Sequence, residues 1–230
     1  MSACDYADEK FAARYAADGP AQFVPGYHFM HQMAVQLIAE SVSDEAAELL
    51  VLGAGGGLEI ARFGSAKPHW QFTGVDPSPE MLNQARGTVR EAGVEGRVTW
   101  VQGYVADAPM RPFDAATCLL TLHFMEDNGE KLDALVNIKA RLKKGAPLIL
   151  VDLCLDQSAD DFDLHRDRYA RFALDSGAAE ELVEQTRGRL KDVLATVSAE
   201  RNVALLRESG FSGIELFYAG LSWRGWIAFA

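Results

Sequence analysis

Five short apolar runs alternate with segments of helical periodicity along most of this chain. The first run, residues 49–53, ends in glycines, which suits a buried parallel strand followed by a tight turn. The other runs span residues 71–75, 97–102, 114–120 and 147–152. Between them, apolar residues recur at the spacing of one helix face. This alternation predicts a mixed α/β fold in which a parallel sheet carries helices on both faces.

The pattern changes near the C-terminus. Residues 213–218 and 223–229 are aromatic-rich runs that only a few residues separate. Such a short connection permits only an antiparallel pair of strands. We therefore expect a mostly parallel seven-stranded sheet with an antiparallel C-terminal strand.

Two helical regions lie outside the strand–helix alternation. Residues 28–41 predict an amphipathic helix, and residues 160–210 predict about three helices with breaks near Ser176-Gly177 and near Ser198. We expect one domain over residues 1–230, with an N-terminal helical cap (1–44) and a helical insert (156–210) between the fifth and sixth strands. Both segments would cover the carboxyl edge of the sheet, where α/β proteins bind ligands.

Charge and composition limit the classes of partner that this chain can bind. The net charge of −11 argues against a nucleic-acid or membrane surface, because phosphate groups are bound through excess Lys and Arg. No apolar stretch approaches the roughly 20 residues of a membrane helix, and the first residues lack the apolar core of a signal peptide. The three cysteines show no metal-ligand spacing. We expect a cytoplasmic protein without a metal site.

A glycine-rich segment follows the first predicted strand: Gly53-Ala54-Gly55-Gly56-Gly57. Glycine tolerates positive φ where a strand turns at once into a helix, and it lets a ligand approach the backbone. The helix that follows would offer free N–H groups and the positive end of its dipole. A purely structural bend is the alternative interpretation.

The second predicted strand ends in Asp76, 23 positions after Gly53. An acidic side chain at this point can accept hydrogen bonds from both ribose hydroxyls. Asp76 could instead cap the next helix, a role for which Ser78 competes. Together with the glycine turn, Asp76 predicts a nucleoside-binding site.

The segments LLVLGAGGGLE and GVDPSPEML resemble motifs I and II of class I S-adenosylmethionine (SAM)-dependent methyltransferases, and FDAATCLLTLHFM and LKKGAPLILVD resemble the later motifs. This resemblance implies a Rossmann-like fold, SAM as cofactor, S-adenosylhomocysteine as product and a small-molecule methyl acceptor. The implied cofactor-binding residues are Tyr27, Gly53, Ala54, Gly55, Asp76, Pro77, Met81, Tyr104, Val105 and Leu119. Two positions depart from the family pattern: Val51 and Tyr104 stand where many members carry acids.

The segments VPGYHFMHQM, TLHF and RLKDVLATVSAERNVALLRESGF are also similar to the carboxy-SAM synthase group and its methyltransferase relatives. This narrower resemblance implies that Tyr27 contacts the cofactor, that Arg187 binds the carboxylate of carboxy-SAM, and that the protein is a homodimer. It offers carboxy-SAM synthesis, or the use of carboxy-SAM in tRNA wobble-uridine modification, as an alternative activity. For Arg187, a solvated helix charge is the competing interpretation.

His123 follows the fourth predicted strand, where it could act as a base on an acceptor that carries a proton. A structural hydrogen-bonding role is the alternative for this histidine. Two other functions stay open: a SAM-binding regulator without turnover, and an NAD-dependent oxidoreductase. Against the oxidoreductase stand Leu58, at the last position of a dinucleotide fingerprint, and the C-terminal strand pair.

Overall fold

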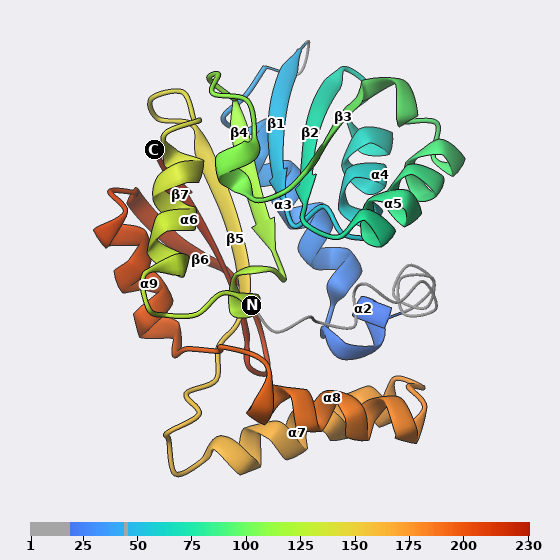
Figure 1. Cartoon of the computed structure of the whole chain (residues 1–230), viewed down its shortest axis with the longest axis vertical. Coiled ribbons are helices and arrows are strands. Elements are labelled where there is room, and N and C mark those ends of the chain that lie inside the picture. Colours follow the sequence, from blue (N-terminus) through green and yellow to red (C-terminus); the bar gives the residue numbers. More distant parts are fainter. Residues whose placement is uncertain (1–18, 44–45) are drawn as a thin grey trace.

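A seven-stranded sheet forms the centre of the molecule (Figure 1). The computed structural model describes residues 19–43 and 46–230. The strands are β1 (Ala47–Leu52), β2 (Trp70–Asp76), β3 (Val98–Gln102), β4 (Ala115–Leu119), β5 (Pro147–Leu153), β6 (Ser212–Gly220) and β7 (Trp223–Phe229). Their order is β3-β2-β1-β4-β5-β7-β6. Strands β1 to β5 are parallel, and β7 is antiparallel to both of its neighbours, β5 and β6. The predicted mostly parallel, seven-stranded α/β fold is confirmed.

Strand β1 explains why its sequence is a continuous apolar run. Leu49 and Val51 pack into the core on one face of the sheet, and Leu50 and Leu52 pack into the core on the other. A strand covered on both faces has no solvent side, so polar residues do not alternate along it.

Helices cover both faces of the sheet (Figure 1). The first core includes residues of α3 (Tyr27–Ala39), α4 (Leu58–Ala66) and α5 (Pro79–Glu91). The second includes residues of α6 (Glu130–Lys139) and α9 (Ala199–Glu208). Three short 3₁₀ turns lie between these elements: η2 (Glu95–Arg97) precedes β3, η3 (Val105–Asp107) follows β3, and η4 (Leu122–Phe124) follows β4. Within the described residues, no helix is both long enough and apolar enough to cross a bilayer.

The helical insert begins with a pair of helices, α7 (Phe162–Asp175) and α8 (Glu180–Asp192). Helix α7 packs on α8 and on the short helix α2 (Gly19–Phe23), where the rings of Phe23 and Tyr169 lie 5.6 Å apart. In Figure 1 the arrowheads of β1 and β4 point toward α2 and the α7–α8 pair. The three expected helices of the insert, with breaks after Asp175 and before Ala199, are therefore present. The proposed cap over residues 1–44 falls partly on residues outside the described ranges.

The two C-terminal strands hold the segment that leads into α3. The indole N–H of Trp223 donates a hydrogen bond to the carbonyl of Phe23 (3.1 Å). The hydroxyl of Tyr218 donates to the carbonyl of Pro25 (2.5 Å). These two bonds fix the chain just before Tyr27, the first residue of α3.

Candidate functional site

The turn between β1 and α4 requires glycine at Gly53. This residue has a φ of 71°, and its N–H and that of Ala54 donate to the carbonyl of Val75 (2.9 and 3.0 Å). A Cβ atom at position 53 would lie 2.0 Å from the hydroxyl oxygen of Thr121. The absence of a side chain therefore lets β1, β2 and the end of β4 come together at one point.

Asp76 stabilises the same turn from the end of β2. One of its carboxylate oxygens accepts a hydrogen bond from the N–H of Gly55 and the other from the N–H of Ser78, each at 2.9 Å. The N-cap of α5 is Ser78, whose hydroxyl accepts from the N–H of Met81 (3.1 Å). Capping is therefore the task of Ser78, and the Asp76 carboxylate keeps further lone pairs for a ligand. Burial raises the pKa of Asp76.

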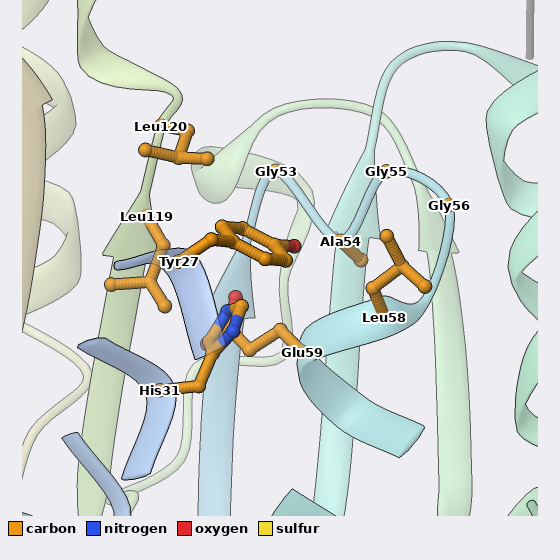
Figure 2. A pocket seen from close by; sticks show the side chains of 10 residues that line it. All are labelled: Tyr27, His31, Gly53, Ala54, Gly55, Gly56, Leu58, Glu59, Leu119 and Leu120. Carbon is orange, nitrogen blue, oxygen red and sulfur yellow. The ribbon is translucent and has the colours of Figure 1, made fainter. Parts of the chain in front are cut away.

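A shallow pocket that opens to solvent lies beside this turn (Figure 2). Its walls come from α3, the glycine turn, the start of α4 and the end of β4. The lining residues are Tyr27, His31, Gly53, Ala54, Gly55, Gly56, Leu58, Glu59, Leu119 and Leu120. The structure thus brings together five of the residues for which we expect cofactor binding: Tyr27, Gly53, Ala54, Gly55 and Leu119.

The residues expected near the ribose and adenine lie farther along the same edge of the sheet. The carbonyl of Asp76 accepts from the N–H of Gly103 (3.0 Å), which joins the ends of β2 and β3. Tyr104 is 45% exposed, whereas the side chain of Val105 is buried in the second core. Pro77 is exposed and Met81 is buried. These residues do not line the pocket, and their contact with the cofactor stays a prediction.

Five lining residues were not among the expected binding residues: His31, Gly56, Leu58, Glu59 and Leu120. Glu59 shares the buried face of α4 with Phe63, four positions later, and an acid on such an apolar face is the signal that could have identified it. His31 follows Tyr27 by one helical turn, and their rings lie 4.4 Å apart. Leu120 has a φ of 56°, a conformation that is strained for leucine.

His123 lies in η4 and is buried, outside the residues that line the pocket. Its Nδ1 atom lies 2.7 Å from a carboxylate oxygen of Asp152, which also accepts from its backbone N–H (3.0 Å). The amide of Asn202 donates to the other oxygen of Asp152 (3.0 Å). This arrangement fixes the imidazole and leaves Nε2 for proton transfer. A base and a structural hydrogen-bonding group both remain consistent with it.

Arg187 lies on α8, and no pocket-lining residue comes from that helix. Its guanidinium forms an ion pair with Asp167 of α7 and lies 3.7 Å from Glu184 on its own helix. These contacts join the two helices of the insert. Binding of a ligand carboxylate by Arg187 stays a prediction.

The site suits a nucleoside that carries a charged amino-acid group. The glycine turn admits a ligand against backbone, Asp76 offers carboxylate lone pairs, and the pocket contains polar side chains in an otherwise apolar wall. If SAM binds here, Gly53 to Gly55 and Tyr27 would hold its amino-acid end and Asp76 its ribose. The fold is a Rossmann-like domain, and its site resembles that of class I SAM-dependent methyltransferases.

Comparison with known proteins supports the same class. Residues 50–148 match the family model described as a methyltransferase domain. The chain is 27% identical over 224 residues to the carboxy-S-adenosyl-L-methionine synthase of Chromohalobacter salexigens, with coverage of 96% of this chain and 82% of the relative. It is 24% identical to the corresponding synthase of Wolinella succinogenes, with coverage of 96% and 91%. Residues 50–148 therefore match a methyltransferase domain, and these similarities support a SAM-dependent methyltransferase with SAM as its cofactor.

Solved structures share the fold at lower identity. The O-methyltransferase family 2 protein of Planctomyces limnophilus, in complex with apigenin, superposes with a TM-score of 0.68 at 16% identity. PigF with S-adenosylhomocysteine superposes with a TM-score of 0.67 at 18% identity. The matches cover 100% and 98% of this chain but 63% and 60% of those longer chains. The chain thus spans about three fifths of these relatives.

Proposed function

We propose that this protein transfers the methyl group of SAM to a small-molecule acceptor. The observation that carries the proposal is the pocket beside Gly53, which α3 borders through Tyr27. A site bordered by a helix over the sheet edge suits a small ligand better than a polymer. The acidic charge of the chain, −11, also disfavours a nucleic-acid acceptor. Apigenin, which is bound to the Planctomyces relative, is a small molecule.

The residues of this chain would act mainly through alignment. SAM, when bound, supplies a methyl group on a positively charged sulfur, which needs no further activation. The glycine turn and Tyr27 would then fix its amino-acid end and Asp76 its ribose, so that the acceptor meets the methyl group in line. When the acceptor is a hydroxyl or a protonated amine, Nε2 of His123 would take its proton, and Asp152 would stabilise the resulting imidazolium.

The test is formation of S-adenosylhomocysteine and of a methylated product over a panel of phenols, acids and amines. We expect His123→Gln to lower kcat by about 10²- to 10⁴-fold, the usual contribution of a general base, with no change in the Kd for S-adenosylhomocysteine. Lys191→Gln, at an exposed position of α8, serves as the control. Tight SAM binding without transfer to any acceptor would instead favour a regulatory SAM-binding protein.

A second candidate is a carboxy-SAM synthase or a carboxy-SAM-using enzyme. It is favoured by the similarity to carboxy-SAM synthases, which extends over 96% of this chain rather than over the methyltransferase motifs alone. Mass spectrometry of ligand released from the purified protein distinguishes the two candidates, since carboxy-SAM is heavier than SAM by one carboxyl group. In this case Arg187→Ala should weaken carboxy-SAM binding and leave SAM binding unchanged. An equal loss for both ligands would contradict the second candidate.

A further inference from the structure

Two buried polar side chains in the pocket each have one atom without a hydrogen-bond partner in the described chain. Glu59 is 7% exposed and His31 is 2% exposed. The Oε1 atom of Glu59 and the Nδ1 atom of His31 form no hydrogen bond. Figure 2 shows both side chains directed toward the pocket, Glu59 from α4 and His31 from α3. A buried polar atom without a partner costs about 1–3 kcal/mol, so the pair indicates groups that a ligand satisfies.

No cation of the described chain neutralises Glu59. Thr117 and Cys118 of β4 lie near it, and the Thr117 hydroxyl interacts with the carboxyl and lowers its pKa against the larger effect of burial. The charged or titratable neighbours on the α3 side are His31 and His28, and Arg62 of α4 acts on His31. The carboxyl group therefore lies among a hydroxyl, a thiol and an imidazole.

Burial keeps the side chains of Glu59 and His31 neutral in the free protein. Burial raises the pKa of Glu59 to about 8. Burial, with the charge of Arg62, lowers the pKa of His31 to about 3. Burial also raises the pKa of the Cys118 thiol. Around pH 7, Glu59 is thus the member of this cluster that still holds a proton it can give up.

We propose that Glu59 binds the α-ammonium group at the amino-acid end of the cofactor and loses its proton when it does so. The proposal rests on SAM being the cofactor. An ammonium group offers three N–H donors and a full positive charge, which suits an unpartnered carboxylate. The neutral imidazole of His31 stands beside it as a donor for the α-carboxylate of the same group. The released proton passes to the buffer, so cofactor binding is coupled to pH.

Calorimetric titration measures this coupling directly. S-adenosylhomocysteine is titrated into the protein at pH 7 in two buffers of different ionisation enthalpy. We expect release of close to one proton for each ligand bound, and none in Glu59→Gln. The probe 5′-methylthioadenosine contains the nucleoside but lacks the amino-acid end, so it should release no proton from either protein.

The affinities provide the second measurement. Glu59→Gln should weaken the binding of S-adenosylhomocysteine by about 10- to 100-fold, the effect of a hydrogen bond to a charged group. It should change the Kd of methylthioadenosine by less than about twofold. Glu200→Gln is the matched control, because Glu200 is also the second residue of its helix but is exposed. Wild-type binding of S-adenosylhomocysteine without proton release, or an equal loss for both ligands, would overturn the proposal alone. Binding of neither ligand by the wild type would overturn the cofactor assignment as well.

Discussion

Gly53 is the residue at which the site tolerates no side chain. Its positive φ and the position of Thr121 both oppose a Cβ atom. We expect Gly53→Ala to cost about 1–3 kcal/mol of unfolding free energy, because the turn must shift to relieve strain and overlap. It should also weaken S-adenosylhomocysteine binding. Urea denaturation and ligand titration measure the two effects.

The matched control for Gly53 is Gly87. It lies within α5, and a Cβ atom added there meets nothing within 4 Å. Gly87→Ala should stabilise the protein by about 0.5–1 kcal/mol, since alanine favours the helix more than glycine does. Equal effects of the two substitutions would show that the turn has no special need for glycine.

Glu59 also makes the stability of the protein depend on pH. Its pKa is about 8 in the folded protein against an ordinary value near 4.5, so the folded state holds a proton that the unfolded chain has lost. Stability therefore falls as the pH rises from about 4.5 to about 8. We expect Glu59→Gln to remove this pH dependence. Its free energy of unfolding should exceed that of the wild type by a few kcal/mol at pH 8, and the difference should be smaller at pH 5.

Chemical denaturation at pH 5, 6, 7 and 8 measures the effect of Glu59→Gln. Asp76, whose pKa is also raised, is present in both proteins and cancels in the difference. Glu215→Gln, at an exposed position of β6, should give the same difference at every pH. A pH-independent difference for Glu59→Gln would refute the buried neutral carboxyl.

At the scale of elements, the buried side chain of Asp152 connects three elements by hydrogen bonds. It lies on β5 and accepts hydrogen bonds from His123 of η4 and Asn202 of α9. We expect Asn202→Ala to cost about 1–3 kcal/mol, because one carboxylate oxygen of Asp152 then loses its donor in the interior. The exposed Asn83→Ala on α5 should change stability by less than about 0.5 kcal/mol. Thermal unfolding of both variants compares them.

The elements themselves were predictable because their signals are local. Strands β1 to β5 coincide with the expected apolar runs to within a few residues. Strands β1, β4 and β5 are covered on both faces and leave no polar alternation, whereas β3, at the edge of the sheet, is only partly buried. Short helix α2 was not predicted, since five residues carry too little periodicity.

The candidate site was predictable only where the motif is local. The glycine turn can be predicted because the backbone there needs glycine, and Asp76 can be predicted because it is an acid at the end of a strand. The contact of Glu59 with the pocket depends on how α4 lies against α3, and the pairing of His123 with Asp152 joins residues 29 positions apart. No spacing rule along the chain reports such contacts, because tertiary packing decides them.

At the scale of the whole molecule, the C-terminal strands hold the segment that leads to Tyr27, a residue of the pocket. Trp223 donates to the carbonyl of Phe23, 200 positions away, just before Tyr27. Trp223→Phe keeps most of the ring but loses this bond. We expect faster amide exchange in residues 19–39, weaker S-adenosylhomocysteine binding, and a loss of about 1 kcal/mol of stability.

Hydrogen-exchange mass spectrometry with and without ligand tests the Trp223 prediction. Trp70→Phe is the control: Trp70 is fully buried too, but its indole N–H has no hydrogen-bond partner to lose. Exchange that rises equally in both variants would mean that loosened packing, not the bond to Phe23, holds the N-terminal segment.

The position of β7 has a consequence for how the protein is made. The last strand of the chain lies inside the sheet, between β5 and β6. While the ribosome is still adding α7 to α9, β5 is complete but its outer edge has no neighbour. An unpaired strand edge is open to association with other chains. The outer edge of β5 therefore stays without a partner until β7 has been made.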